Sequence, residues 1–208
     1  MAACTVLLTC SAGCNVIGTA AVVLKGPPTT DAVHTLAKDR ATVFFVDDRG
    51  SRLPRRSMRM TIASTAGNTL LEKKVLTTVI EPRAGLEAAA GESPSAPMDL
   101  VTLTRHARAE IMVYANVREF SLSTDGQSLQ PMARLRVKVI DATNDTGRVW
   151  PDDPEGFDLR VIAPPTTGQV PRTAAEMMKV QESFAEFIGQ SLAKLFYEHE
   201  TRPSISTK

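Results

Sequence analysis

The stretch ARLRVKV at residues 133–139 alternates apolar and basic side chains without a break. Successive side chains of a β-strand point to opposite faces of its sheet, so Ala133, Leu135, Val137 and Val139 face the interior. The basic side chains between them face water. The pattern therefore predicts an antiparallel strand in a sheet with one buried face and one wetted face.

A second alternating run precedes this strand at residues 111–122. Its apolar phase shifts by one position near Arg118 and Glu119, which predicts a β-bulge there and a bent strand. Residues 148–150 and 157–163 predict two further short strands, each bounded by turn-forming residues. The second half of the chain therefore forms most of the sheet.

Nearer the N-terminus, residues 42–46 form an apolar run rich in β-branched and aromatic residues, which predicts a buried central strand. Ser51 is predicted to cap a helix that runs to about Lys74. Its apolar residues at four-residue spacing are Met58, Ile62, Ala66 and Leu70. A second short strand is predicted at residues 75–80, because the following Glu81-Pro82 ends it.

Two further helices complete the predicted fold. Asp99 caps a short helix over residues 100–106, and Thr173 with Glu176 forms a capping box before a long amphipathic helix that ends near Glu198. The sequence predicts an α+β fold, an α/β sandwich whose mixed, largely antiparallel sheet is covered by the long C-terminal helix and an N-terminal helix. The predicted element order is β-α-β-α-β-β-β-α.

Composition limits the function classes. The chain has 208 residues, of which 43% are hydrophobic, and its 24 basic and 23 acidic residues give a formal net charge of +1. This length suits one globular domain, and the balanced charge supplies no overall field that would hold nucleic acid. The mean hydropathy of -0.08 and the absence of an apolar run of roughly 20 residues exclude a multi-pass membrane protein.

All three cysteines lie at the N-terminus, at Cys4, Cys10 and Cys14, and no charged residue occurs in residues 1–24. A short apolar stretch leads to SAGC at residues 11–14, which resembles a lipobox, the site at which lipoprotein processing acylates a cysteine and cuts before it. We therefore predict that Cys14 is lipidated. Because the next residue is not aspartate, the expected location is the periplasmic face of the outer membrane.

The predicted organisation is a lipoprotein signal peptide at residues 1–13, a lipid-anchored tether at 14–35, one α/β domain at 36–200 and a disordered tail at 201–208. The alternative is that the first segment is an ordinary apolar element of a cytoplasmic α/β domain, in which Cys14 is a small buried residue.

Common catalytic patterns do not occur in the sequence. The three histidines, His34, His106 and His199, are scattered, and none lies beside a glycine-flanked serine. The sequence has no phosphate-binding glycine loop and no zinc-ligand spacing, so we predict no catalytic residues, metal or cofactor. A hydrolase that uses Asp47 and Asp48 is the alternative, although an Asp-Asp pair is more typical of a solvated turn.

Two basic groups are candidate binding residues. The first is an arginine-rich group at the start of a predicted helix, where cations oppose the helix dipole unless an anion or an acidic partner offsets them. Its members are Arg49, Arg52, Arg55, Arg56 and Arg59. The second is the row Arg134, Arg136 and Lys138, which indicates either a partner-binding surface or simply a wet sheet face.

The sequence resembles a group of uncharacterised bacterial lipoproteins. The resemblance rests on CNVIG at 14–18, on VFFVDD at 43–48 with LPRRS at 53–57, and on RVKVIDA at 136–142. More distantly, the element order and TGRVW at 146–150 are similar to accessory envelope lipoproteins of the curli-secretion, penicillin-binding-protein activator and lipopolysaccharide-assembly types.

This resemblance implies a lipid-tethered periplasmic domain that acts by binding and not by catalysis. The leading hypothesis is a non-enzymatic envelope protein that binds a protein partner in outer-membrane assembly, secretion or transport, with a homo-oligomer as a possibility. The alternative within the envelope is a module that binds an anionic ligand through the arginine group.

Overall fold

The computed structural model describes residues 28–91, 97–123, 129–144, 147–164 and 171–201. The predicted signal peptide, Cys14, most of the tether and nearly all of the tail lie outside the described residues. The chain divides into two units, one of which is the α/β unit Ala32–Tyr197. In the other unit, β1 (Thr29–Thr30) pairs antiparallel with β8 (His199–Glu200).

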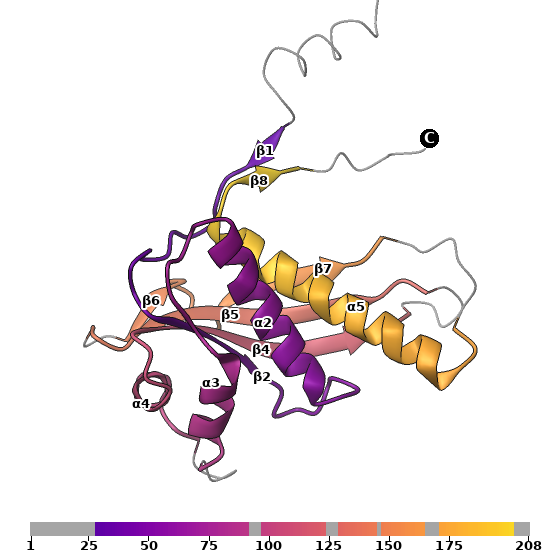
Figure 1. The fold of residues 1–208 in the computed structure, drawn as a ribbon, viewed down its shortest axis with the longest axis horizontal. Helices are drawn as coiled ribbons and strands as arrows, with labels where there is room; N and C mark the ends of the chain where they lie inside the picture. Colours follow the sequence, from indigo (N-terminus) through magenta and orange to yellow (C-terminus); the bar gives the residue numbers. More distant parts are fainter. Residues whose placement is uncertain (1–27, 92–96, 124–128, 145–146, 165–170, 202–208) are drawn as a thin grey trace, which may run out of the picture. The chain divides into compact units, whose positions relative to one another are not determined.

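The α/β unit is built on one six-stranded sheet with the order β3-β2-β4-β5-β6, in which β7 also pairs with β5 (Figure 1). The strands are β2 (Thr42–Asp47), β3 (Val79–Ile80), β4 (Ile111–Ser121), β5 (Met132–Asp141), β6 (Arg148–Trp150) and β7 (Phe157–Ile162). β2 is parallel to β3 and β4, whereas β5 is antiparallel to β4, β6 and β7. The predicted fold class is confirmed.

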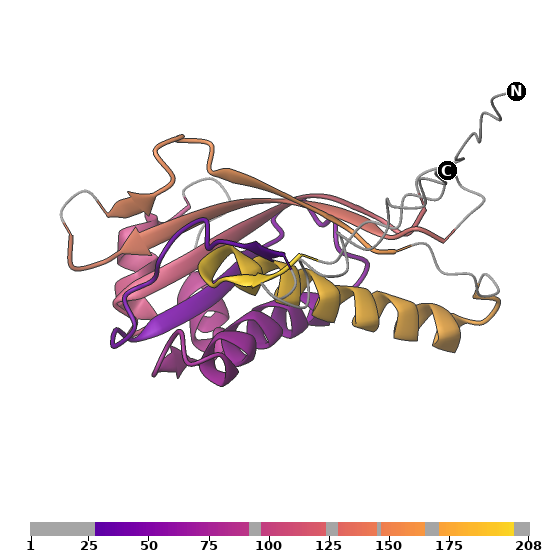
Figure 2. The ribbon, with the colours of Figure 1, turned by 90° about the horizontal axis from the view of Figure 1, so that it is seen from above.

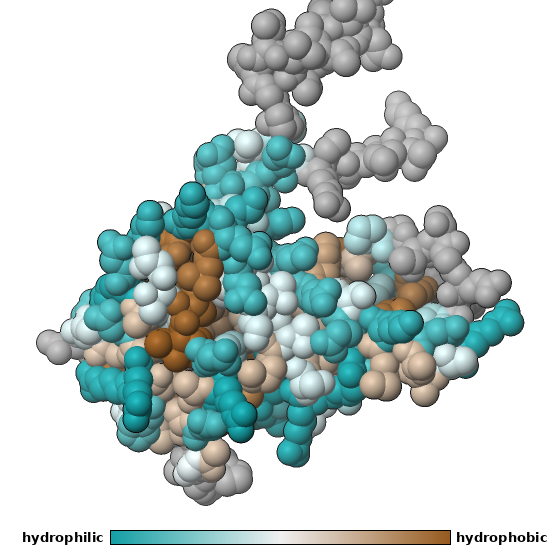
Figure 3. All heavy atoms as spheres, viewed as in Figure 1, coloured by the Kyte–Doolittle hydropathy of each residue, from teal (hydrophilic) through white to brown (hydrophobic). Residues whose placement is uncertain are grey.

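One face of the sheet carries the main core. It is covered by α2 (Ser57–Glu72) and α5 (Ala174–Ala193), which cross in front of the strands in Figure 1 and lie together on one side of the sheet in Figure 2. The alternating apolar side chains of β4 and β5 point into this core, as predicted. The outer side of the helix layer is mixed in polarity, with a hydrophobic patch beside α2 (Figure 3).

The opposite face carries a smaller core beneath two short helices, α3 (Pro82–Ala89) and α4 (Leu100–His106). Its buried residues come from the first half of β2, the start of β4, the end of β5 and from α4 with the residues after it. They are Val43, Phe45, Leu103, Ala107, Ala109, Met112 and Ile140. Farther along the same strands, the side chains on this face are polar or charged, and apart from the buried Asp47 they are partly exposed.

Several local predictions are confirmed. The β4–β5 register shifts between Val117 and Glu119, at the predicted bulge. The Asp99 side chain accepts hydrogen bonds from two backbone N–H groups of α4, and the Thr173 capping box precedes α5. The four-residue apolar stripe of α2 is buried against α5 and the sheet.

The predicted start of α2 is wrong. The helix begins at Ser57, and Ser51 lies in a turn with a φ of 48°. The physical reason is Asp48, whose carboxylate accepts the backbone N–H groups of Arg52 and Leu53 and so holds the chain in a loop before the helix.

Other boundaries differ from the prediction. α3 was not predicted, since Pro82 was interpreted only as the end of a strand, whereas proline also suits the first position of a helix. The preceding strand is confined to Val79–Ile80. α5 ends at Ala193 and is followed by the 3-10 turn η1 (Lys194–Phe196), so the helix stops before the predicted Glu198.

Candidate binding face

The polar face of the sheet brings Arg49 of the first predicted basic group together with Arg136 and Lys138 of the second. Pairing across four strands places Asp47, Asn116, Arg136 and Asp158 in one row. In the next row, Lys138 lies beside Tyr114. These rows belong to the face opposite α2 and α5, because the alternate residues of the same strands form the main core.

A polar hollow of about 250 Å³ opens on this face, and we call it the basic hollow. Its lining residues are Asp47, Arg49, Tyr114, Asn116, Arg118, Arg136, Lys138 and Glu155. Four of these side chains are cationic and two are acidic, which gives the lining a formal charge of +2. The hollow therefore offers an excess of positive charge to an acidic group.

The floor of the hollow is Asp47, which is 3% exposed. The Tyr114 hydroxyl donates a hydrogen bond to Asp47 Oδ2 at 2.5 Å, and the Arg49 backbone N–H donates to Oδ1 at 3.1 Å. Arg49 Nε lies 3.1 Å from Oδ2 and offsets the buried charge. Asp47 is thus held within the fold by one hydroxyl, one backbone N–H group and one guanidinium group.

Tyr114 acts here as a hydrogen-bond donor. Burial raises the pKa of its hydroxyl well above the ordinary value, and the neighbouring Asp47 raises it further. A tyrosine with a raised pKa keeps its proton at neutral pH, so it cannot serve as a phenolate base or nucleophile.

The rim of the hollow holds cations that are less fully paired. Arg136 donates to the Gly156 carbonyl at 3.0 Å, and its Nε lies 3.8 Å from Asp158. Arg118 lies 3.9 Å from Glu155. Within the described part of the chain, Lys138 has no hydrogen bond or ion pair, so its ammonium is available to a bound anion.

The five arginines of the first predicted group separate in the structure. Arg49 lines the basic hollow, whereas Arg52 and Arg56 are exposed. Arg59 donates to the Val46 carbonyl at 2.7 Å, and its guanidinium lies 5.6 Å from the centre of the Phe45 ring. Burial lowers the pKa of Arg59, although nearby carboxylates oppose this shift.

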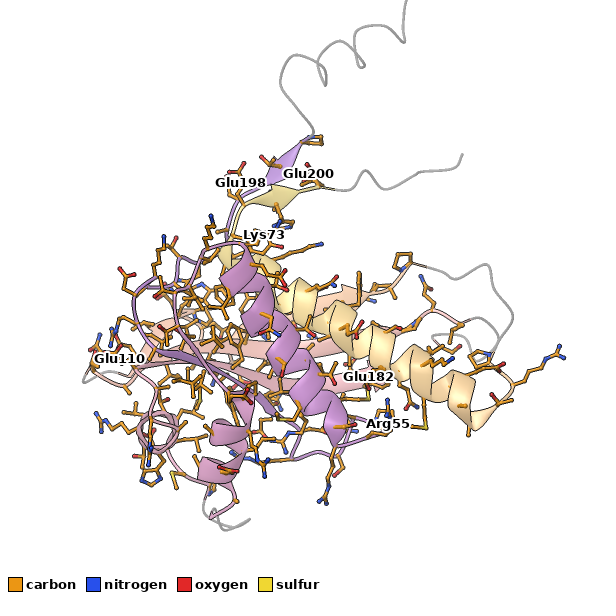
Figure 4. The ribbon with its side chains drawn as sticks, in the orientation of Figure 1. Arg55, Lys73, Glu110, Glu182, Glu198 and Glu200 are labelled. Carbon is orange, nitrogen blue, oxygen red and sulfur yellow. The ribbon has the colours of Figure 1, made fainter. Side chains whose placement is uncertain are left out.

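Arg55 connects the loop before α2 to α5. Its guanidinium donates to Gln181 Oε1 at 3.0 Å, to the Met178 carbonyl at 3.2 Å and to Glu182 at 2.9 Å. Arg55 and Glu182 lie close to one another in Figure 4. Arg55 therefore contributes to the packing of the two helices on the main-core side and does not line the basic hollow.

The second predicted group also divides. Arg136 and Lys138 line the hollow, whereas Arg134 makes two hydrogen bonds to Asp158, at 2.7 and 2.8 Å. The hydrogen bonds from Arg134 are the largest of the effects that lower the pKa of Asp158. This pairing leaves Arg134 less available to a partner than Lys138.

Four lining residues were missed as site candidates by sequence reasoning, and one of them, Arg118, was named only as the position of the bulge. Tyr114 and Asn116 alternate with the apolar residues of β4, so their position on the polar face follows from the same period that predicted the strand. Glu155 carried no such signal, because it lies in the turn before β7.

No group of three or more potential metal ligands occurs among the residues that the structure describes. In that same part of the chain, no helix has the length and apolar character needed to cross a membrane.

Comparison with known proteins gives matches among solved structures only. No protein-family model and no curated protein matches the chain. It is similar to the PelC dodecamer from Paraburkholderia phytofirmans, with 18% identity over 82% of this chain and 96% of that chain and a TM-score of 0.45.

Two further similar structures are a lipoprotein and a C-terminal domain. The lipoprotein GNA1162 from Neisseria meningitidis is 10% identical over 71% of this chain and 96% of that chain, with a TM-score of 0.41. The C-terminal domain of LpoB from Salmonella enterica is 11% identical over 62% of this chain and 84% of that chain, with a TM-score of 0.37. These three likenesses are distant, at 18% identity or less and TM-scores of 0.45 or less. What the chain does has therefore to be inferred from its own residues.

Proposed function

We propose that this protein is a non-enzymatic, lipid-anchored envelope protein that binds an acidic protein partner through the basic hollow and the sheet face around it. The observation that carries this proposal is the meeting of Arg49 with Arg136 and Lys138, which lie far apart in the sequence. With Arg118 of β4, the hollow gathers cations from two strands and from the loop after β2. Such a surface is suited to an acidic partner, because complementary charge guides and orients association.

Binding without catalysis follows from the chemistry of the same residues. The buried Asp47 is engaged by Tyr114 and Arg49, and Tyr114 retains its proton. The cations at the rim supply attraction and hydrogen-bond donors, which orient an acidic group.

The anchor rests on the sequence SAGC at residues 11–14. We place the acyl chains on Cys14 and the folded unit in the periplasm, held at the outer membrane by the tether. A single acyl chain gives only reversible membrane binding, and the several chains of a processed lipoprotein give stable attachment.

Intact mass and membrane fractionation of the native protein, compared with a Cys14→Ser variant, test the anchor. We expect an acylated protein that begins at Cys14 and fractionates with the outer membrane, and a variant that is released from it. An unprocessed protein that begins at Met1 and stays out of the membrane fraction would contradict the anchor and favour the cytoplasmic alternative.

Copurification from solubilised membranes tests the binding face. We expect Lys138→Glu to lose proteins that the unaltered chain retains, because the variant places a carboxylate in the hollow. Lys179→Glu makes the same charge change on α5, on the other side of the sheet, and serves as the matched control. If both variants retain the same proteins, the proposed face is wrong. Recovery of a differently tagged copy of this chain would identify the partner as a second subunit.

A further inference from the structure

A second polar hollow adjoins the basic hollow on the same sheet face. It has a volume of about 300 Å³, and we call it the α4 hollow because the start of α4 forms one wall. Its lining residues are Asp99, Leu100, Val101, Lys138, Ile140 and Arg148. Lys138 lines both hollows, so the two are neighbours with one ammonium between them.

Asp99 in the α4 hollow and Asp47 at the floor of the basic hollow already have partners within the fold. Asp99 accepts hydrogen bonds from the backbone N–H groups of Val101 and Thr102 and so caps α4. Asp47 is held by Tyr114 and Arg49. Asp47 thus neutralises Arg49, whereas among the described residues neither carboxylate forms an ion pair with Arg118, Lys138 or Arg148.

The cations are less fully satisfied than the carboxylates. Arg148 donates to the Asp152 carbonyl at 3.3 Å, a bond to a neutral group that leaves its charge unpaired. Arg118 has only a 3.9 Å ion pair, and Lys138 forms no hydrogen bond or ion pair with any other described residue. Arg118, Lys138 and Arg148 thus form a row of incompletely paired cations that begins in one hollow and ends in the other.

Two glycines hold the walls of the hollows in place. Gly156 has a φ of 94°, and a Cβ there would lie 3.0 Å from the Val137 carbonyl and 3.1 Å from Lys138 Cγ. Its own carbonyl accepts the hydrogen bond from Arg136. At Gly147, with a φ of 69°, a Cβ would overlap the Val101 side chain. The turns before β6 and β7 can therefore pack this closely only with glycine.

We propose that the two hollows form one track that takes an extended acidic peptide segment of the partner, with Lys138 between two acidic side chains. This inference rests on the proposed function and specifies its ligand. The basic hollow receives one carboxylate near Arg118, and the α4 hollow receives another near Arg148. A linear ligand is favoured because the cations lie in sequence along two adjoining depressions and not around a single point.

The remaining lining residues favour a peptide over an acidic polysaccharide. Leu100, Val101 and Ile140 give the α4 hollow an apolar wall that suits an aliphatic side chain between the acidic ones. Sugar rings commonly stack on aromatic side chains, and Tyr114 is the single aromatic residue among those that line the two hollows. Its hydroxyl is turned to Asp47 at the floor.

Fluorescence anisotropy with a labelled oligoglutamate peptide and the full chain in detergent tests the track. We expect binding that weakens as salt is added, and roughly tenfold weaker binding in Lys138→Glu. Arg118→Glu and Arg148→Glu, at opposite ends, are each expected to weaken binding severalfold. Lys138→Gln removes the charge without reversing it and should give an intermediate loss. Lys179→Glu should bind as the unaltered chain does.

Three results would overturn the proposal: no binding of the peptide, equal losses in Lys138→Glu and Lys179→Glu, or dependence on only one of Arg118 and Arg148. Tighter binding of polygalacturonate than of oligoglutamate would also overturn it, in favour of a glycan. If the peptide fails to bind while membrane copurification still depends on Lys138, the peptide assignment alone is wrong. If the peptide binds but the native protein carries no acyl chain and retains no partner, the proposed function is wrong.

Discussion

The two faces of the central sheet are formed by the same strands, but one face is buried and apolar whereas part of the other is exposed and charged. Toward α2 and α5, Phe44 is 0% exposed and Leu135 is 1% exposed. Toward the other side, the alternate residues Arg134 and Arg136 keep 39% and 24% of their side chains exposed. A single two-residue period therefore produces one face that stabilises the fold and another whose charges remain accessible to a partner.

The difference depends on which helices the chain supplies. α5 is long and has an apolar side of Phe184, Ile188 and Leu192, so it can cover the whole length of the main core. α3 and α4 are short and cover only the first part of the opposite face. The basic hollow lies where that cover ends.

The largest expected effect comes from breaking the buried face. Phe44→Ala should lower the free energy of unfolding by about 3–5 kcal/mol, because it removes a fully buried ring and leaves a cavity. Asn116→Ala, three strand positions farther along on the polar face of the neighbouring strand, should change it by less than about 0.5 kcal/mol. Chemical denaturation of both variants measures the contrast. Equal losses would show that the polar face is as important for stability as the core.

A smaller loss of stability is expected from a substitution at Arg55. This substitution tests whether Arg55 is structural, unlike the arginines of the binding face. Arg55→Ala should destabilise the fold by about 1 kcal/mol, since it removes three partly exposed contacts to α5. It should leave oligoglutamate binding unchanged. Arg56→Ala, at the exposed neighbour, should alter neither quantity. Weaker peptide binding in Arg55→Ala would place that arginine in the binding face after all.

Tyr114 links the floor of the hollow to stability at alkaline pH. Its folded pKa is raised above the unfolded value, so its contribution is complete below the unfolded pKa of about 10 and is lost as the pH rises toward the folded pKa. The unfolding free energy of the unaltered chain should therefore fall more steeply above pH 10 than that of Tyr114→Phe. Parallel pH profiles for the two proteins would contradict the raised pKa of Tyr114, which burial and then the hydrogen bond to Asp47 cause.

The smallest effect is expected at the exposed pair of Arg134 and Asp158. The pKa of Asp158 lies below its ordinary value, with hydrogen bonds from Arg134 as the main cause. Its contribution to stability is therefore present above the unfolded pKa and is lost as the pH falls through the folded pKa. In Arg134→Gln, a carboxyl titration by nuclear magnetic resonance should show the pKa of Asp158 rising toward its ordinary value. An unchanged titration would mean that Arg136 and Arg160 hold the carboxylate by themselves.

The sequence predicted those parts of the fold that depend on near neighbours. Alternation identified β4 and β5, the phase shift located the bulge at Arg118, and the capping box located the start of α5. Ser51 failed as a helix cap because the nearby Asp48 competes for the same backbone N–H groups. α3 was missed because proline both ends strands and begins helices.

The candidate site was only half predictable. Arg49, Arg136 and Lys138 were identified as candidates, but their meeting depends on the insertion of β4 between β2 and β5. That order is a long-range property which no local pattern encodes. The sequence could not distinguish the roles of Arg55 and Arg59 from that of Arg49. The packing of α2 places Arg55 against Glu182 of α5 and Arg59 against the Val46 carbonyl of β2.

The most direct test of the central claim is photo-crosslinking in intact cells from position 116, beside the basic hollow, and from position 186 on α5. We predict that position 116 crosslinks to a protein partner at the outer membrane and that Lys138→Glu abolishes this crosslink. Any crosslink from position 186 should be the same in the unaltered chain and in Lys138→Glu. A crosslink from position 116 that persists in Lys138→Glu, or one that forms only from position 186, would contradict the account.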